Sequence, residues 1–105
     1  MMNVSEKDWK LFRKKLPEWQ EAYMENLVEE YIDILKQEGL ASDKYWMLEK
    51  RIKDDKRNPG VLLRDVRRSN YYFHLTALVG WKVITFDDLD EFSEETRETI
   101  SRMVG

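Results

Sequence analysis

The side chains best suited to chemistry form a basic cluster in the middle of the chain, followed by tyrosine. Guanidinium groups bind phosphates through paired hydrogen bonds, and tyrosine rings can stack on nucleic-acid bases. On a helix, Arg64, Arg68 and Tyr72 would lie on one face, because they are spaced four residues apart. The residues that we assign to this candidate surface for an anionic partner are Lys50, Lys53, Arg57, Arg64, Arg67, Arg68 and Tyr72.

The overall charge argues against nucleic acid as the main partner. The chain has a net charge of −3 and a pI of about 5.3, whereas nucleic-acid-binding domains are usually basic. The charge is nevertheless sorted along the chain, with net values of +3 in 6–15, −6 in 18–38, +5 in 44–68 and −5 in 86–105. Two interpretations remain open. Either oppositely charged helices pack side by side and pair, or the basic segment binds an anionic partner.

Other reactive side chains give weaker signals. His74 is the only histidine, and its neighbours in the sequence provide no partner for a catalytic dyad. The acidic run at Asp87, Asp88 and Asp90 lacks the glycine and the spacing of a calcium loop, so helix capping explains it better. The absence of cysteine excludes disulfides, thiolate metal sites and a cysteine nucleophile. We therefore predict a non-enzymatic chain with no metal and no cofactor.

The first third of the chain predicts helix. Ser5 can cap a helix start, and apolar residues then recur at steps of three and four from Trp9 to Ile34. Pro17 interrupts this run, because proline removes a backbone donor and clashes with the preceding turn. We expect a short helix over 6–15 and a long one over 17–38. The alternative is one kinked helix, since the apolar stripe keeps its phase across the proline.

Capping and turn residues divide the remainder. Gly39 suits the end of the long helix, and Asn58-Pro59-Gly60 is a strong turn signal. Thr85 and Ser93 can each cap a following helical segment. The expected elements are helices over 42–57, 61–79 and 94–104, with a single turn over 86–91.

These elements predict one all-α domain over 1–105. It would be a small bundle of four main helices with a short or kinked N-terminal helix before Pro17. The 37% charged residues, with only 4 Gly and 2 Pro, favour helices, and the 12% aromatic residues supply a core. No apolar run approaches the roughly 20 residues that span a bilayer, so we expect no membrane partner and a cytoplasmic location.

The long helix carries more apolar surface than one neighbour can cover. Met24, Val28 and Ile32 lie beside the main stripe and widen the apolar arc. We therefore predict a protein-interaction or structural module that associates with a protein partner or with itself, as a homodimer, through these three residues. The alternative is a small nucleic-acid-binding or regulatory protein that uses the basic cluster.

Three segments carry a resemblance to a known family. They are Trp9-Lys10-Leu11-Phe12-Arg13 with Glu18-Trp19-Gln20-Glu21-Ala22-Tyr23, then Leu48-Glu49-Lys50-Arg51-Ile52, then Ile84-Thr85-Phe86-Asp87-Asp88-Leu89. Together they resemble a family of short, uncharacterised helical proteins of Gram-positive bacteria, over nearly the whole chain. That family has no established activity, so the resemblance implies a bacterial, all-helical protein and no function. Some such sequences bear transporter-like names, which the lack of a spanning segment contradicts.

Overall fold

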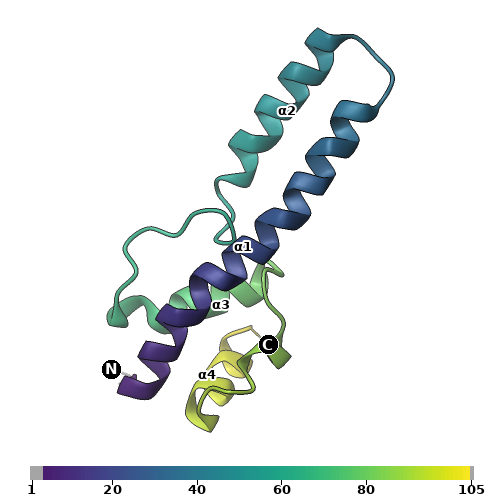
Figure 1. Ribbon diagram of the computed structural model, residues 1–105. Helices are drawn as coiled ribbons and strands as arrows, with labels where there is room; N and C mark the ends of the chain where they lie inside the picture. Colours follow the sequence, from purple (N-terminus) through teal and green to yellow (C-terminus); the bar gives the residue numbers. More distant parts are fainter. Residues whose placement is uncertain (1–3, 105) are drawn as a thin grey trace.

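The computed structural model describes residues 4–104, and within them it contains four α-helices joined by turns and two 3-10 segments (Figure 1). The elements are α1 (Glu6–Lys36), α2 (Ala41–Asp55), η1 (Arg68–Asn70), α3 (Tyr71–Gly80), η2 (Phe86–Leu89) and α4 (Glu94–Val104). The all-α prediction is confirmed. The helix predicted over 42–57 is α2, the final helix is α4 with the predicted bounds, and η2 is the predicted turn.

The predicted break at Pro17 is wrong, because α1 is a single helix of 31 residues with Pro17 inside it. Its start is as expected, since the Asp8 amide donates to Ser5 Oγ over 3.1 Å. Buried residues occur on both sides of the proline, at Leu16 and at Leu27, so packing favours one continuous axis. The proline ring is exposed, and the helix loses one backbone hydrogen bond on its solvent side. The apolar stripe, which keeps its helical spacing across Pro17, therefore predicted the extent of this helix better than the proline did.

The C-terminal half of α1 and the whole of α2 form an antiparallel hairpin that projects from the rest of the molecule (Figure 1). We call this hairpin, over residues 23–56, the arm. The molecule is accordingly elongated, with dimensions of 53 × 25 × 24 Å. Gly39 lies in the loop at the tip of the arm, where its φ of +146° suits glycine. The cap itself is at Gln37.

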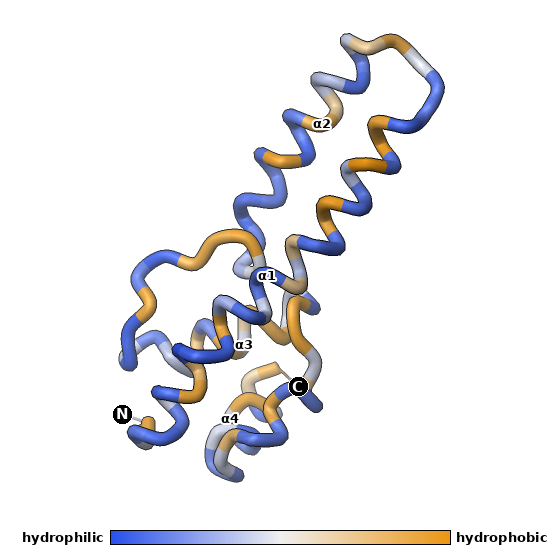
Figure 2. The backbone as a smooth tube through the Cα atoms, viewed as in Figure 1, coloured by the Kyte–Doolittle hydropathy of each residue, from blue (hydrophilic) through white to orange (hydrophobic). Residues whose placement is uncertain are grey.

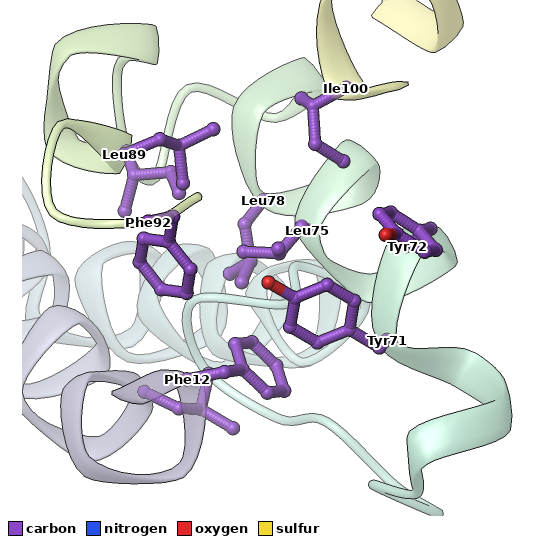
Figure 3. Packing of buried hydrophobic residues seen from close by; sticks show 10 residues of the cluster. Phe12, Tyr71, Tyr72, Leu75, Leu78, Leu89, Phe92 and Ile100 are labelled. Carbon is purple, nitrogen blue, oxygen red and sulfur yellow. The ribbon is translucent and has the colours of Figure 1, made fainter. Parts of the chain in front are cut away.

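The first half of α1 packs with α3, η2 and α4 into a compact unit, which we call the base. Figure 3 shows the side chains that meet there, with Phe12 of α1 beside residues from the other elements. Phe12 and Tyr71 pack edge to face, with 5.5 Å between ring centroids. The buried core consists of Phe12, Leu16, Tyr71, Tyr72, Leu75, Leu78, Ile84, Leu89, Phe92 and Ile100.

The helix predicted over 61–79 begins ten residues late, at Tyr71, and residues 61–67 form a non-helical connection. Asn58 contacts Tyr23 at one end of this connection, and Tyr71 packs on Phe12 at the other. The connection must therefore run back along α1 by about 11 residues, roughly 17 Å. Asp65 lies in the middle of this connection with a positive φ of 61°, and a right-handed helix cannot continue through that backbone conformation.

A buried polar cluster joins the start of α1 to the start of α4. The Asp8 carboxylate accepts hydrogen bonds from the Ser93 amide (3.1 Å), the Ser93 hydroxyl (2.5 Å) and the Thr96 hydroxyl (2.7 Å). Tyr71 contacts Thr96 Oγ1 at 2.9 Å. Burial raises the pKa of Asp8, but the hydrogen bonds from Ser93 and Thr96 outweigh it, so the pKa lies below its ordinary value. The negative charge of Asp8, on α1, lies at the N-terminus of α4 and holds the two helices together there.

No helix in the part of the chain that the structure describes is both long enough and apolar enough to cross a lipid bilayer.

Candidate protein-interaction surface on the arm

Polar contacts hold the two helices of the arm together. The Tyr31 hydroxyl donates to the Asp55 carboxylate, and Arg51 forms ion pairs with Asp55 (3.1 Å) and Glu30 (3.0 Å). The Arg51 guanidinium also lies over the Tyr31 ring, 5.7 Å from its centroid. Burial, together with the hydrogen bond to Asp55, raises the pKa of Tyr31 to about 12. These contacts fix the position of α2 along the axis of α1, which we call its height.

The junction between arm and base is tightly packed. The Asn58 side-chain amide donates to the Tyr23 hydroxyl (2.7 Å) and its oxygen accepts from the Gly60 amide (2.8 Å). Gln20 donates to the carbonyl of Pro59 over 3.0 Å. A Cβ at Gly60 would lie 2.6 Å from the Tyr23 ring, so only glycine fits there without movement. The arm therefore has a fixed attachment to the base.

Some opposite charges pair between elements that pack together. The acidic second half of α1 packs along α2, which carries four basic and four acidic residues, and Arg51 of α2 pairs with Glu30 of α1. In the base, Lys15 pairs with Glu91 over 3.1 Å, which joins the basic first segment to the acidic last one. Such exposed pairs each contribute little to stability. Arg68 pairs with Glu6 of the other basic segment, so pairing between segments of opposite charge accounts for only part of the pattern.

The arm half of α1 has an apolar stripe that no other residue among 4–104 covers. The exposed fractions are 40% for Met24, 51% for Val28 and 43% for Ile32. Leu35 continues the stripe towards the tip and is also exposed. A groove at its lower end is lined by Met24 and Val28, with Glu21, Glu25 and Glu29 as its acidic side. The predicted self-association residues thus form one continuous exposed line, and the recurrent hydrophobic positions can be followed in Figure 2.

The helix α2 adds a second stripe that the sequence analysis did not assign to any surface. None of the residues of α2, all of which the structure describes, is fully buried. An open groove on this helix is lined by Tyr45, Leu48 and Ile52, with Glu49, Lys53 and Lys56 at its edge. The sequence signal for this stripe was the helical spacing of its apolar residues, with lysines beside them. A core position and an exposed stripe produce the same spacing, so the sequence alone could not separate them.

Both stripes lie on the same side of the arm. Val28 directly follows Leu27, which is buried, and Ile52 directly follows Arg51, which contacts α1. Each side chain therefore points about 100° away from the face that packs on the other helix, because one residue along an α-helix turns the side-chain direction by that angle. The turn has the same sense along the chain in both helices. Because the helices are antiparallel, rotations of the same sense point to the same side of the pair. We call this combined surface the arm face, which comprises Met24, Val28, Ile32, Leu35, Tyr45, Leu48 and Ile52.

The predicted basic surface is not assembled. Lys50 and Lys53 lie on α2 in the arm, and Arg57 follows that helix. Arg68, in contrast, lies in the base, where it pairs with Glu6 and sits 6.0 Å from the Trp9 ring centroid. Arg51 contacts Glu30 and Asn58 contacts Tyr23, so roughly 17–24 residues, or about 26–36 Å of helix, separate the arm residues from Arg68.

The remaining members of the basic cluster also differ from the prediction. Arg64 and Arg67 lie in the non-helical connection, and Arg67 pairs with Asp65 over 2.8 Å. Tyr72 belongs to the buried core and cannot stack on a base from there. The error follows from the late start of α3, because the i, i+4, i+8 spacing has meaning only on a helix.

The other reactive side chains have structural positions. His74 is buried on α3, with its Nε2 3.4 Å from the Asp65 carbonyl. Asp88 accepts from the Thr85 amide over 2.7 Å and forms a capping box with Thr85, as its position suggested. Among residues 4–104, no group of three or more histidine, cysteine or acidic residues is arranged to hold a metal ion.

Comparisons with protein-family models, curated proteins and solved structures find no match for this chain. The resemblance to short helical proteins of Gram-positive bacteria therefore remains a prediction. Functional reasoning has to start from the arm face.

Proposed function

We propose that this chain is a non-enzymatic interaction module whose arm face binds another protein surface. The observation that carries the proposal is the arm itself, a rigidly attached helical hairpin with an apolar stripe on each helix and both stripes on one side. The base supplies the stable core, and the arm contributes exposed surface. This division suits a protein whose role is to present one face to a partner.

The amount of apolar surface supports the proposal. Seven side chains, exposing roughly half of about 200 Å² each, give an apolar patch on the order of 600–700 Å². The largest apolar patch on a typical monomeric protein is about 300–600 Å² and is often functional. The arm face is at or above that range, and its acidic and basic edges form the polar rim that protein interfaces share.

A single charged substitution tests the proposal. Val28→Asp places a carboxylate in the centre of the arm face at an exposed site, so it leaves the fold intact. Met47→Asp is a matched control, because Met47 has the same exposed fraction, 51%, and lies five residues before Ile52, about 140° around α2 from the arm face. We expect the purified tagged chain to form a complex of defined stoichiometry, with itself or with one host protein. Val28→Asp should abolish the complex and Met47→Asp should preserve it. Equal behaviour of both variants would contradict the proposal.

Nucleic-acid binding is the alternative function, and the separated basic residues support it less. A binding site on the arm would use Lys50, Lys53 and Arg57, because Arg68 is engaged with Glu6 in the base. Salt-dependent binding of an oligonucleotide that disappears in Lys50→Glu/Lys53→Glu would support it. Unaltered binding after the Arg64, Arg67 and Arg68 side chains are changed to Glu would exclude the cluster as a unit.

A further inference from the structure

We infer that the arm face is covered by the arm face of a second copy of this chain, with α1 of each copy packed on α2 of the other. The inference rests on the proposed function and names its partner. Two hairpins packed in this way form an intermolecular four-helix bundle, the usual way in which amphipathic helical hairpins bury a shared face. Three features of the arm point to this occupant.

Charge complementarity is the first feature. The α1 stripe is bordered by Glu21, Glu25 and Glu29, and the α2 stripe by Lys53 and Lys56 in its half nearer the base and by Glu49 one turn nearer the tip. A twofold axis parallel to the helices places α1 of one copy on α2 of the other, so Glu25 and Glu29 meet the two lysines. The competing arrangement, α1 on α1, would bring acidic borders together and is disfavoured. A single chain therefore carries both halves of a self-complementary surface.

The heights of the charges are the second feature. Within one chain, Glu30 contacts Arg51 and Tyr31 contacts Asp55, so these parts of α1 and α2 lie at the same level. A twofold axis parallel to the helices preserves that level between copies. Glu29 of one copy then lies opposite Lys53 of the other. Glu25 and Lys56 lie about one turn closer to the base on their helices and form the next pair.

The third feature is the area of the arm face. Its apolar side chains offer on the order of 600–700 Å², and the charged borders add to this. A stable protein interface buries about 800 Å² on each partner. The arm face thus matches a standard-sized homodimer interface without any contribution from the base.

Sedimentation velocity over a range of concentrations tests the inference first. The natural chain should sediment as a dimer at high concentration. Val28→Asp should lower the association constant on the order of 100-fold or more, because twofold symmetry introduces the charge twice at the centre of the interface. Met47→Asp should dimerise normally. Circular dichroism of both variants verifies that the helices are intact.

Charge exchange tests the pairing of α1 with α2. Glu25→Lys/Glu29→Lys and Lys53→Glu/Lys56→Glu should each lose dimerisation when alone, because like charges then face each other twice. An equimolar mixture of the two should form a heterodimer, in which every border is complementary again. If α1 instead packs on α1, the first variant alone will dimerise as well as the natural chain, and the inference is wrong.

The outcomes also separate this inference from the proposed function. A natural chain that stays monomeric at high concentration overturns the dimer. If Val28→Asp still abolishes a complex between that monomer and a different protein, the interaction module survives without the dimer. If Val28→Asp changes neither self-association nor any complex, both proposals fail.

Discussion

Replacing Asp8 by asparagine tests how the base is held together. The Asp8 carboxylate is buried and accepts three hydrogen bonds from Ser93 and Thr96 at the start of α4. Asparagine keeps the shape, but it removes the negative charge and turns one acceptor into a donor that faces hydroxyl groups. The contacts between the first turn of α1 and the first turn of α4 should weaken together.

The expected loss can be worked from these contacts. A hydrogen bond to a charged group contributes about 1.5–3 kcal/mol, and a neutral acceptor about half of that. The interaction of the charge with the helix N-terminus adds about 0.3–1 kcal/mol. The asparagine oxygen can still accept from the Ser93 amide, and the two hydroxyls can rotate to accept from the new amide group, so we expect each bond to fall to about half its value and a net loss of about 3–5 kcal/mol in the free energy of unfolding. A domain of this size has only about 5–15 kcal/mol in total.

Urea unfolding followed by tryptophan fluorescence measures this loss. Glu6→Gln is the matched control, since Glu6 lies in the same turn of α1 but is exposed, and we expect it to change stability by less than about 0.5 kcal/mol. The pH dependence adds a second check. The pKa of Asp8 is lowered in the folded state, so its contribution is complete above its unfolded pKa, about 4, and is lost as the pH falls through the folded pKa. A loss for Asp8→Asn below about 0.5 kcal/mol at pH 7 would refute this account of the base.

Three further predictions concern the arm and its attachment. Gly60→Ala should destabilise the chain by about 1–3 kcal/mol in urea unfolding, because its Cβ would overlap the ring it packs on. Gly80→Ala, in open space, should be neutral or stabilising by about 0.5–1 kcal/mol. The hydrogen bond of neutral Tyr31 stabilises the arm below pH 10 and should be lost as the pH rises through about 12. Circular dichroism should show this loss in the natural chain and a flatter profile in Tyr31→Phe. Pro17→Ala should restore one backbone hydrogen bond and increase the free energy of unfolding by up to about 3 kcal/mol, which raises the thermal midpoint. A lower midpoint would show that the fold needs proline there.

Local signals predicted three helix starts correctly, but not the end of α1, which is capped by Gln37 and not by Gly39. The caps at Ser5, Thr85 and Ser93 were all predicted from side chains three residues before a matching position, and each forms the expected hydrogen bond. Capping depends only on neighbouring residues, so the sequence contains all of the information.

Features set by distant contacts were not predictable from local spacing. Leu63 and Val66 have helical spacing, but they pack on the core from a connection that has to cross the base. The Asp8 cluster joins residues about 85 positions apart, and no local pattern indicates it. The basic surface failed for the same reason, because Arg64 and Arg68 share a face only if the segment is a helix. The apolar line at Met24, Val28 and Ile32 was found because α1 is regular.

Oxidation of two methionines in the same chain tests the dimer most directly. Met24 lies on the arm face and Met47 lies outside it, and both are exposed in a single copy. Dilute peroxide converts exposed methionine to the sulfoxide, and mass spectrometry gives the rate at each site. As the concentration rises through the range of self-association, we predict that oxidation of Met24 slows several-fold while oxidation of Met47 keeps its rate. Rates at Met24 and Met47 that stay equal and independent of concentration would contradict the account.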